Sequence, residues 1–136
     1  MTENALIKKL QLKPGLRALF LNAPEGYVTS LGPLPDGVAL ADGPTGTLDF
    51  AQLFVRDSAE LTTHAPAALA AIKRDGVFWI SYPKKSSGVV SDLTRDEGWA
   101  PIAAAGLRPV TQIAVDTTWS AVRWRSIELV KSRTSG

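Results

Sequence analysis

A polar segment with the side chains of an anion-binding site follows one of the apolar segments of this chain. Its residues are Lys84, Lys85, Ser86 and Ser87. Ammonium and hydroxyl groups donate hydrogen bonds to anions, and a helix predicted to begin near Thr94 would direct its first N–H groups toward the same volume. We predict that this segment binds phosphate, a nucleotide or an acidic peptide. The alternative is a solvated loop whose serines cap the next helix.

Further polar and aromatic residues are predicted to lie at the edge of a pocket. They are Asn22, Tyr27, Arg56, Asp57 and Tyr82, and they stand at or just beyond the ends of apolar segments. In an open parallel sheet, ligands bind outside the carboxyl ends of the strands. Arg56 and Asp57 could contact a ribose or guard the pocket, or Asp57 could simply cap a following helix. The two tyrosines could line the pocket or complete the core.

The composition argues against several kinds of catalytic site. The chain contains no cysteine and a single histidine, His64. A histidine-based metal site or a Ser-His-Asp triad would therefore have to be built around His64, which falls within a predicted helix. Carboxylates are scattered singly along the chain, so no converging set of acid, base and nucleophile is visible. We predict no catalytic residue, no metal and no cofactor.

Charge and targeting signals bear on partners and location. Fifteen basic and 13 acidic side chains among 136 residues give a formal net charge of +2. Such a weak field argues against nucleic acid as the partner. The sequence has neither a signal-like start nor the run of about 20 apolar residues that a membrane span needs. We therefore predict a cytoplasmic protein that does not contact membranes.

Short apolar segments alternate with segments of helical periodicity. Strands are predicted at 16–21, 38–41, 48–55, 77–82, 110–115 and 119–127, and helices at 3–12, 27–31, 58–74 (with a break near Pro66) and 94–105 (with a kink at Pro101). Strands separated by helices favour a parallel sheet, whereas the tight turn 116–118 allows only an antiparallel final pair. The prediction is an α/β fold: one three-layer, Rossmann-like domain over residues 1–130, with a mostly parallel sheet of about six strands ending in an antiparallel hairpin. Residues 131–136 are predicted to form a flexible tail.

The sequence contains four tryptophans. Strand alternation predicts that Trp124 faces the core and that Arg123 and Arg125 face solvent, with Trp79 and Trp119 filling the same core. The alternative is a surface on which Trp124 and its flanking arginines stack on single-stranded nucleic acid.

The turn after the first predicted strand differs from a phosphate-binding loop. Residues 22–27 contain one glycine, whereas a dinucleotide-binding loop carries three. Pro24 lacks an N–H donor, and the carboxylate of Glu25 repels phosphate. The scaffold therefore resembles that of a nucleotide-binding protein, but the loop does not.

Several strand ends resemble those of a small bacterial domain-of-unknown-function family. They are an apolar strand ending in Asn-Ala-Pro, the ends Leu-Phe-Val-Arg-Asp and Trp-Ile-Ser-Tyr-Pro-Lys-Lys, and a final hairpin with Trp119 and Trp124, over about Leu10 to Arg125. The architecture is similar to a shortened class I S-adenosylmethionine methyltransferase core, which ends in the same antiparallel pair. That resemblance implies a glycine-rich loop after the first strand, where Pro24 and Glu25 stand. It also implies an acidic residue ending the second strand, where Asp42 stands.

Two functions follow as hypotheses. The first is a non-catalytic binding or regulatory module for an anionic small molecule or a protein partner. The alternative is a methyltransferase-related enzyme with an altered cofactor loop. Generic binding of nucleic acid through the basic tail is a weaker third hypothesis.

Overall fold

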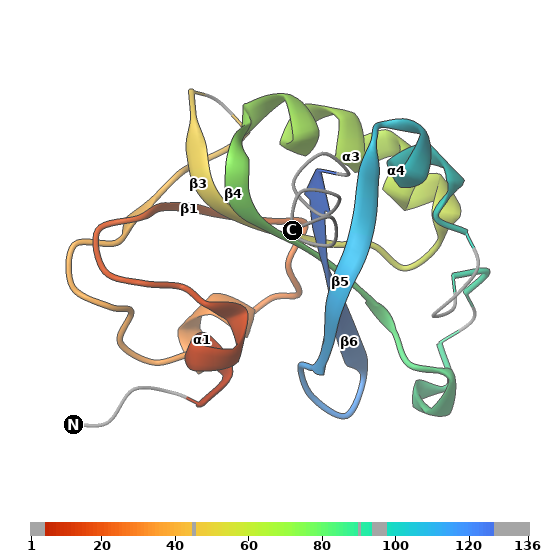
Figure 1. Cartoon of the computed structure of the whole chain (residues 1–136). Helices are drawn as coiled ribbons and strands as arrows, with labels where there is room; N and C mark the ends of the chain where they lie inside the picture. Colours follow the sequence, from red (N-terminus) through yellow and green to blue (C-terminus); the bar gives the residue numbers. More distant parts are fainter. Residues whose placement is uncertain (1–4, 45, 90, 94–97, 127–136) are drawn as a thin grey trace.

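The computed structural model describes residues 5–44, 46–89, 91–93 and 98–126. They form a six-stranded sheet with the strand order β2-β1-β3-β4-β6-β5 (Figure 1). The strands are β1 (Arg17–Leu21), β2 (Ala39–Leu40), β3 (Leu48–Phe54), β4 (Ile72–Pro83), β5 (Leu107–Ala114) and β6 (Trp119–Ser126). The helices are α1 (Ala5–Leu10), α2 (Tyr27–Ser30), α3 (Ser58–Ala71) and α4 (Ala100–Ala104), and a 3-10 turn, η1, covers Lys85–Ser87. The predicted tail at 131–136 lies outside the described residues, as does the start of the predicted helix 3–12.

The sheet is parallel in its first part and antiparallel at one end. β1 pairs in parallel with β2 and β3, and β3 pairs in parallel with β4. β6 then pairs antiparallel with both β4 and β5. Every residue of β3 from Phe50 to Phe54 is buried, as expected for a central strand covered on both faces. The predicted mostly parallel α/β sheet with a closing hairpin is confirmed.

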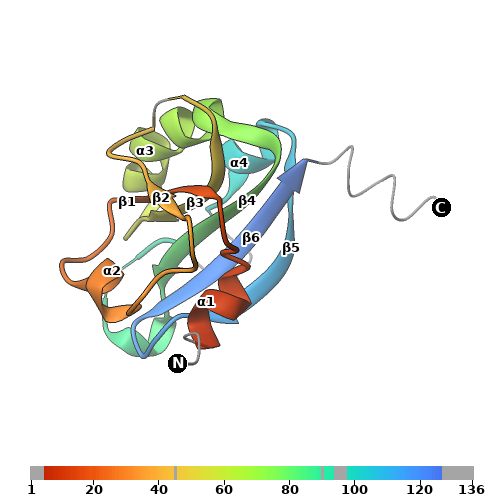
Figure 2. The same cartoon turned by 90° about the vertical axis from the view of Figure 1, so that its left-hand side faces the viewer.

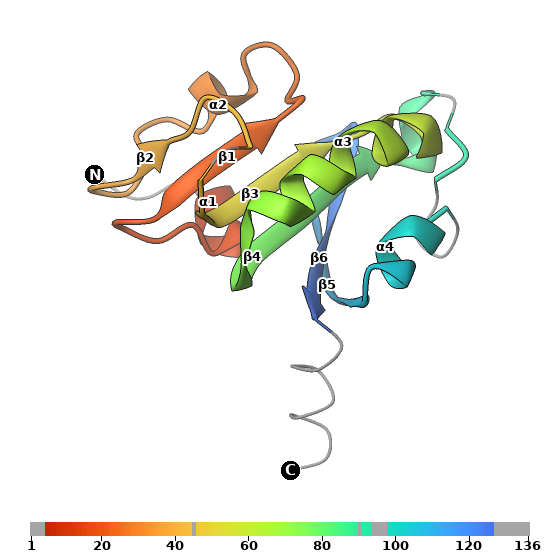
Figure 3. The same cartoon turned by 90° about the horizontal axis from the view of Figure 1, so that it is seen from above.

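Helices cover both faces of the sheet, which gives three layers (Figure 2). On one face, Leu61 and Ala68 of α3 and Ile102 of α4 belong to one buried cluster with the strand residues Leu53 and Ile80. On the other face, a second buried cluster joins α1 and α2 to the strands through Ile7, Leu10, Tyr27, Phe50, Phe54 and Trp79. Figure 3 shows α3 running along β3 and β4, as the crossover between two parallel neighbours requires. The sheet is therefore shared by two separate hydrophobic cores.

The order of the strands reverses at β1. After β1 the chain adds β2 on one side, and β3 then pairs on the opposite side of β1. The connections that leave β1 and β3 consequently diverge at the carboxyl ends of these strands. A crevice at such a switch point is where open α/β sheets bind ligands.

Helix α3 differs from the prediction at Pro66. Pro66 does not break α3, which runs unbroken from Ser58 to Ala71. Pro66 is exposed, whereas Ala65 and Ala68 are buried on either side of it, so packing holds the helix while the proline ring projects outward.

The next strand begins directly after this helix, at Ile72, and passes through Gly76, where a turn is predicted from the sequence. A Cβ at Gly76 would lie 2.8 Å from Cδ1 of Ile72 and 3.1 Å from the carbonyl oxygen of Asp49. Glycine is therefore needed here for the close approach of strands within the sheet, not for a turn.

The tryptophans do not share one core. Trp79 and Trp119 lie in the cluster under α1 and α2, whereas Trp124 lies in the cluster under α3 and α4. Side chains alternate along β6 as predicted, but the face that carries Arg123 is also covered. Nη1 of Arg123 donates to Oε1 of Gln11 at 2.9 Å, and Arg123 is half-buried. The expectation that the arginines face solvent is wrong, because both faces of this sheet carry a helical layer.

The predicted helix 94–105 is described only in its second half. Residues 94–97 lie outside the described residues, and α4 covers Ala100–Ala104. Pro101 lies in the first turn of α4, where backbone N–H groups have no acceptor within the helix. The proline therefore costs no intrahelical hydrogen bond and does not kink the helix. Among the described residues, no helix has the length and apolar character needed to span a membrane.

Candidate ligand-binding site

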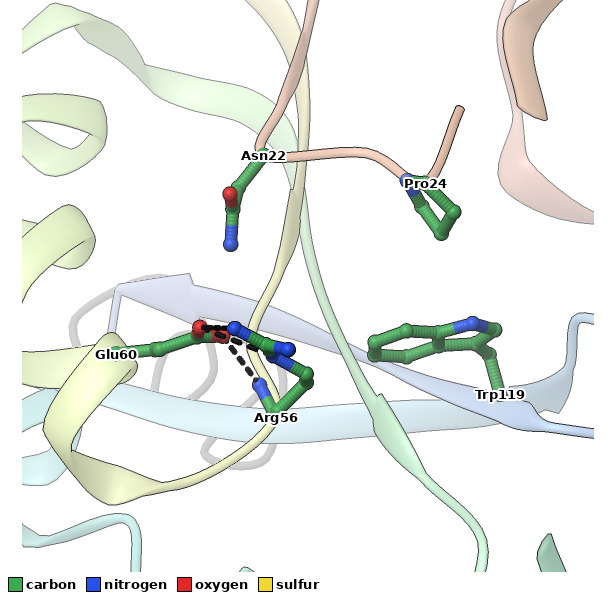
Figure 4. Close-up of a pocket in the computed structure, with 5 residues that line it drawn as sticks. All are labelled: Asn22, Pro24, Arg56, Glu60 and Trp119. Carbon is green, nitrogen blue, oxygen red and sulfur yellow. Dashed lines mark hydrogen bonds and ion pairs between the residues drawn. The ribbon is translucent and has the colours of Figure 1, made fainter. Parts of the chain in front are cut away.

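A pocket of about 240 Å³ lies at the carboxyl ends of β1 and β3. Its lining residues are Asn22, Pro24, Arg56, Glu60 and Trp119. Figure 4 shows Asn22, Pro24, Arg56 and Trp119 around a common space, with Glu60 against the guanidinium group of Arg56. Trp119 begins β6 and pairs with Pro83, the last residue of β4, so it also belongs to this edge of the sheet. The pocket therefore lies at the switch point of the fold.

Asn22 forms one wall and fixes the loop that leaves β1. Its backbone has φ 61°, in the left-handed region that asparagine tolerates better than most residues. The side-chain Nδ2 donates to the carbonyl oxygen of Phe54 at 2.8 Å, which ties the end of β1 to the end of β3. The carboxamide Oδ1 accepts no hydrogen bond from the described part of the chain.

Arg56 and Glu60 form an ion pair that is closed by three hydrogen bonds. The backbone N–H of Arg56 donates to Oε1 of Glu60 at 2.8 Å, while Nε and Nη2 donate to Oε2 at 3.1 and 2.7 Å. Both residues are placed by the start of α3, whose N-cap Asp57 accepts from the backbone N–H of Glu60 at 2.9 Å. The i, i+4 spacing brings the two side chains together.

The ion pair fixes the charge state of both groups. The hydrogen bond and charge of Arg56 hold the pKa of Glu60 below its ordinary value. The same contact raises the pKa of the Arg56 guanidinium further. Glu60 therefore stays ionised and Arg56 stays protonated across the neutral range.

Trp119 and Pro24 supply the apolar walls. The turn before β6 positions the indole, because Oδ1 of Asp116 accepts from the backbone N–H groups of Thr118 and Trp119, each at 2.8 Å. The Trp119 ring then meets Phe54 edge-to-face, with centroids 5.2 Å apart. Pro24 is half-buried and faces the same space as the indole.

The sequence-predicted pocket-edge residues fall into two groups. Asn22 and Arg56 line the pocket, whereas Asp57 caps α3. Tyr82 is buried, and its hydroxyl accepts from Nε2 of Gln112 at 3.2 Å. Tyr27 is also buried. The side chains of Asp57, Tyr82 and Tyr27 do not line the pocket.

The hydroxyl of Tyr27 enters a buried polar chain across the sheet. It donates to Oε1 of Gln52 at 2.9 Å, and Nε2 of Gln52 donates to Oγ of Ser81 at 2.9 Å. Gln52 and Ser81 have no exposed surface. Burial raises the pKa of Tyr27 to about 12, so its hydroxyl remains protonated and keeps donating to Gln52 at neutral pH.

The predicted anion-binding segment forms a turn whose residues do not line this pocket. The backbone N–H of Lys84 donates to the carbonyl oxygen of Thr118 at 2.7 Å, and Oγ of Ser87 donates to the carbonyl oxygen of Lys84 at 2.6 Å. Lys85 and Ser86 are exposed. The turn ends at Gly88, and the helix that follows in the described chain begins only at Ala100. Within the described residues no α-helix begins beside Lys84 and Lys85, and anion binding by this segment stays a prediction.

Pro24, Glu60 and Trp119 were not among the predicted site residues. The i, i+4 spacing of Arg56 and Glu60 is visible in the sequence and could have indicated the ion pair. No local signal identifies Trp119, because its place depends on the antiparallel pairing of β6 with β4. Among the described residues, no group of three histidine, cysteine, aspartate or glutamate side chains could hold a metal ion.

Solved structures with a similar fold include methyltransferases. The chain superposes on the N-methyltransferase NodS from Bradyrhizobium japonicum WM9 with a TM-score of 0.56 and 12% identity, covering 90% of this chain and 93% of NodS. For the ribosomal protein L11 methylase from Lactobacillus delbrueckii subsp. bulgaricus the TM-score is 0.55 at 13% identity, over 88% of this chain and 74% of the methylase. For TrmN from Thermus thermophilus it is 0.53 at 13% identity, over 88% of this chain but only 46% of TrmN.

These similarities define the class of fold. The described chain has the Rossmann-like architecture of a class I S-adenosylmethionine-dependent methyltransferase core, as the sequence predicted. No family model matches the chain, so the resemblance to a small bacterial family stays a prediction. No curated protein matches it either.

Proposed function

We propose that this chain is a non-catalytic binding or regulatory module that takes up a small molecule in the pocket at the switch point. The observation that carries the proposal is the Arg56–Glu60 pair, with its shortest contact at 2.7 Å. A general acid or base needs a pKa near the working pH. Because each partner holds the other in its charged form, the titratable lining residues can orient a ligand but do not exchange protons with it near neutral pH.

The residues at the switch point do not fit S-adenosylmethionine, the cofactor that the fold class implies. Pro24 removes a backbone donor from the loop after β1, and the N–H of Tyr27 is already bonded to the carbonyl oxygen of Pro24 at 3.0 Å. The helix that follows, α2, is only four residues long and offers little dipole toward a ligand. Asp42, after β2, is exposed and does not line the pocket. We therefore derive no transfer step through this cofactor.

A methyltransferase-related enzyme remains the second candidate, and the observation in its favour is the likeness of fold to the methyltransferases above. Isothermal titration calorimetry separates the two candidates. We expect no heat of binding with S-adenosylmethionine in the micromolar range. Micromolar affinity would favour the enzyme instead.

A thermal-shift screen tests the binding module directly, because a ligand that binds only the native state raises the melting temperature. The ligands are S-adenosylmethionine, nucleotides, inorganic phosphate and small aromatic amides. The proteins are the wild type, Trp119→Ala, which removes one wall, and Lys84→Ala/Lys85→Ala, which removes the exposed cations. The unliganded melting temperature of each variant serves as its own baseline.

We expect at least one ligand to stabilise the wild type and the double lysine variant but not Trp119→Ala. A shift that survives Trp119→Ala and disappears in the lysine variant would place binding at the η1 turn. No shift with any ligand would contradict small-molecule binding and favour a protein partner.

A further inference from the structure

We propose that the switch-point pocket selects an uncharged, planar ligand with an amide-like edge and rejects carboxylates and phosphates, because Glu60 already occupies the anion-binding side of Arg56. This inference rests on the proposed function, since it names the chemical class of ligand for the same pocket. It differs from the sequence-based expectation of an anionic ligand.

The first step of the argument concerns charge. Arg56 directs its backbone N–H, Nε and Nη2 at the two oxygens of one carboxylate, at 2.8, 3.1 and 2.7 Å. An anionic ligand would have to share Arg56 with Glu60, whose carboxylate stays on Nε and Nη2 of the guanidinium. The ligand would therefore meet the Glu60 carboxylate at close range, and two carboxylates repel each other. The two lining charges cancel, so the pocket carries no net field for an anion.

The second step concerns the hydrogen-bonding groups that are left. Within the described residues, Nη1 of Arg56 donates no hydrogen bond and Oδ1 of Asn22 accepts none. In the described chain, Arg56 and Asn22 therefore leave free N–H donors and one free acceptor at the lining of the pocket. A carboxamide or a lactam presents the complementary pair, a carbonyl oxygen beside an N–H group. A carboxylate presents acceptors only and would leave Oδ1 of Asn22 facing a second acceptor.

The third step concerns shape. Trp119 and Pro24 lie on one side of the pocket and provide flat apolar surfaces. Arg56 and Asn22 lie on the other side (Figure 4). A planar ring can lie against the indole with its polar edge toward Arg56 and Asn22. The volume of about 240 Å³ lies below the range of common ligand pockets, about 300–1,000 Å³. The pocket therefore suits a single ring with one polar substituent.

The test uses two probes of nearly identical shape, benzamide and benzoate. Binding is followed by NMR through the indole N–H signal of Trp119, assigned by its loss in Trp119→Phe. For the wild type we expect benzamide to bind about threefold to tenfold more tightly than benzoate. Glu60→Gln keeps the shape of the side chain and removes its charge, so the positive charge of Arg56 is no longer neutralised. In this variant we expect the order of the two affinities to reverse.

Glu25→Gln is the matched control, because Glu25 is an exposed carboxylate beside Pro24 that does not line the pocket. It should leave the order of affinities unchanged. If Glu25→Gln changes the order as much as Glu60→Gln does, a general field rather than the Arg56 contact sets the preference, and the inference is wrong.

The remaining outcomes separate this inference from the proposed function. If both probes shift the Trp119 signal but wild type prefers benzoate, or if Glu60→Gln leaves the preference for benzamide intact, the pocket binds ligands and only the assigned ligand class is wrong. If neither probe shifts the signal while the spectra show folded protein, the proposed pocket itself fails together with the inference.

Discussion

Tyr27 shows how a residue predicted to line a pocket can instead organise the core beside it. Its ring packs edge-to-face on Phe54 with centroids 4.7 Å apart, and Phe54 in turn contacts Trp119. Its hydroxyl satisfies a buried acceptor on Gln52. The ring therefore supports the pocket wall from behind, and its hydroxyl contributes stability rather than ligand binding.

The alkaline stability of the protein is expected to depend on this hydroxyl. Burial raises the pKa of Tyr27 to about 12, whereas a tyrosine in an unfolded chain ionises near pH ~10. The contribution is complete below the unfolded pKa and is lost as the pH rises through this window toward the folded pKa. Urea unfolding at a series of alkaline pH values should therefore show a falling free energy of unfolding.

Tyr27→Phe is the control for that titration. It should cost about 1–3 kcal/mol at neutral pH, because it leaves an acceptor of Gln52 unsatisfied. It should also lose less stability between pH ~10 and the folded pKa of about 12 than the wild type does. An equal alkaline loss in both proteins would assign the effect to other groups.

Trp124 is expected to be the most sensitive of the predicted core residues. It is 3% exposed and packs on Trp99 with ring centroids 5.4 Å apart. Trp124→Ala should cost about 3–5 kcal/mol in the free energy of unfolding, because it leaves a large cavity.

A matched variant tests the cause of that loss. Within the described residues the indole Nε1 of Trp124 is buried without a hydrogen-bond partner. Trp124→Phe removes this unpaired donor together with part of the ring, so its cost should be less than half that of the alanine variant. A loss below about 1 kcal/mol for Trp124→Ala would mean that the ring is exposed, and would favour the nucleic-acid alternative.

At the scale of the elements, Asp49 joins three neighbouring strands at the edge opposite the pocket. From β3, its Oδ2 accepts from the backbone N–H of Arg17 in β1 at 2.8 Å, and its Oδ1 pairs with Nζ of Lys73 in β4 at 3.0 Å. The hydrogen bond from Arg17, followed by that from Lys73, lowers the pKa of Asp49. The carboxylate thus favours the register of the parallel strands.

This contact predicts a specific acid sensitivity. Because the folded pKa of Asp49 is lowered, its contribution is present above the unfolded value, near pH ~4, and is lost as the pH falls toward the folded pKa. Asp49→Asn keeps an acceptor but no charge, and should cost about 1 kcal/mol at neutral pH after allowance for solvent screening. Its free energy of unfolding should also fall less steeply on acidification, as measured by urea unfolding at a series of acidic pH values. A parallel acid profile in both proteins would contradict this role.

The order of the elements was predictable from the sequence, but some of their ends were not. Buried parallel strands such as β3 appear as largely apolar runs, and turn residues mark the hairpin before β6. The end of α3 was missed because no turn separates it from β4: Ile72 continues the helical spacing of Leu69 but already pairs with Leu48. Pairing between strands determines where α3 ends, and the local hydrophobic periodicity of the sequence does not reveal that pairing.

The site was predictable only in part for a related reason. Asn22 directly follows β1 and Arg56 lies two residues after β3, so the rule for parallel sheets leads to them. Trp119 begins a strand rather than ending one, and it reaches the same edge because β6 runs antiparallel to β4. The lysines of the η1 turn follow the same rule as Asn22, yet they do not line the pocket.

At the scale of the whole molecule, two cores share one sheet and should unfold together. Ile7 anchors the cluster under α1, and Leu61 anchors the cluster under α3. Since β3 and β4 contribute side chains to both, neither core can lose its packing without exposing the sheet that supports the other. We expect one cooperative transition by tryptophan fluorescence and far-ultraviolet circular dichroism.

Two substitutions test this coupling. Ile7→Ala and Leu61→Ala, on opposite faces, should each lower the free energy of unfolding by about 2–5 kcal/mol and shift both spectroscopic transitions equally. Separate midpoints for the two signals in either variant would show that the cores unfold independently.

The two margins of the sheet bear on how this protein behaves at high concentration. β2 offers only two residues, and β5 carries Pro109 together with a break in register between Pro109 and Thr111. An edge strand with free N–H and C=O groups can pair with a strand of another chain, and repeated pairing of this kind produces fibrils. A short or interrupted row of N–H donors prevents it. One margin is short and the other is interrupted. Replacing Pro109 would restore an N–H donor to β5. At high protein concentration we expect that variant to form polymers more readily than the native sequence does.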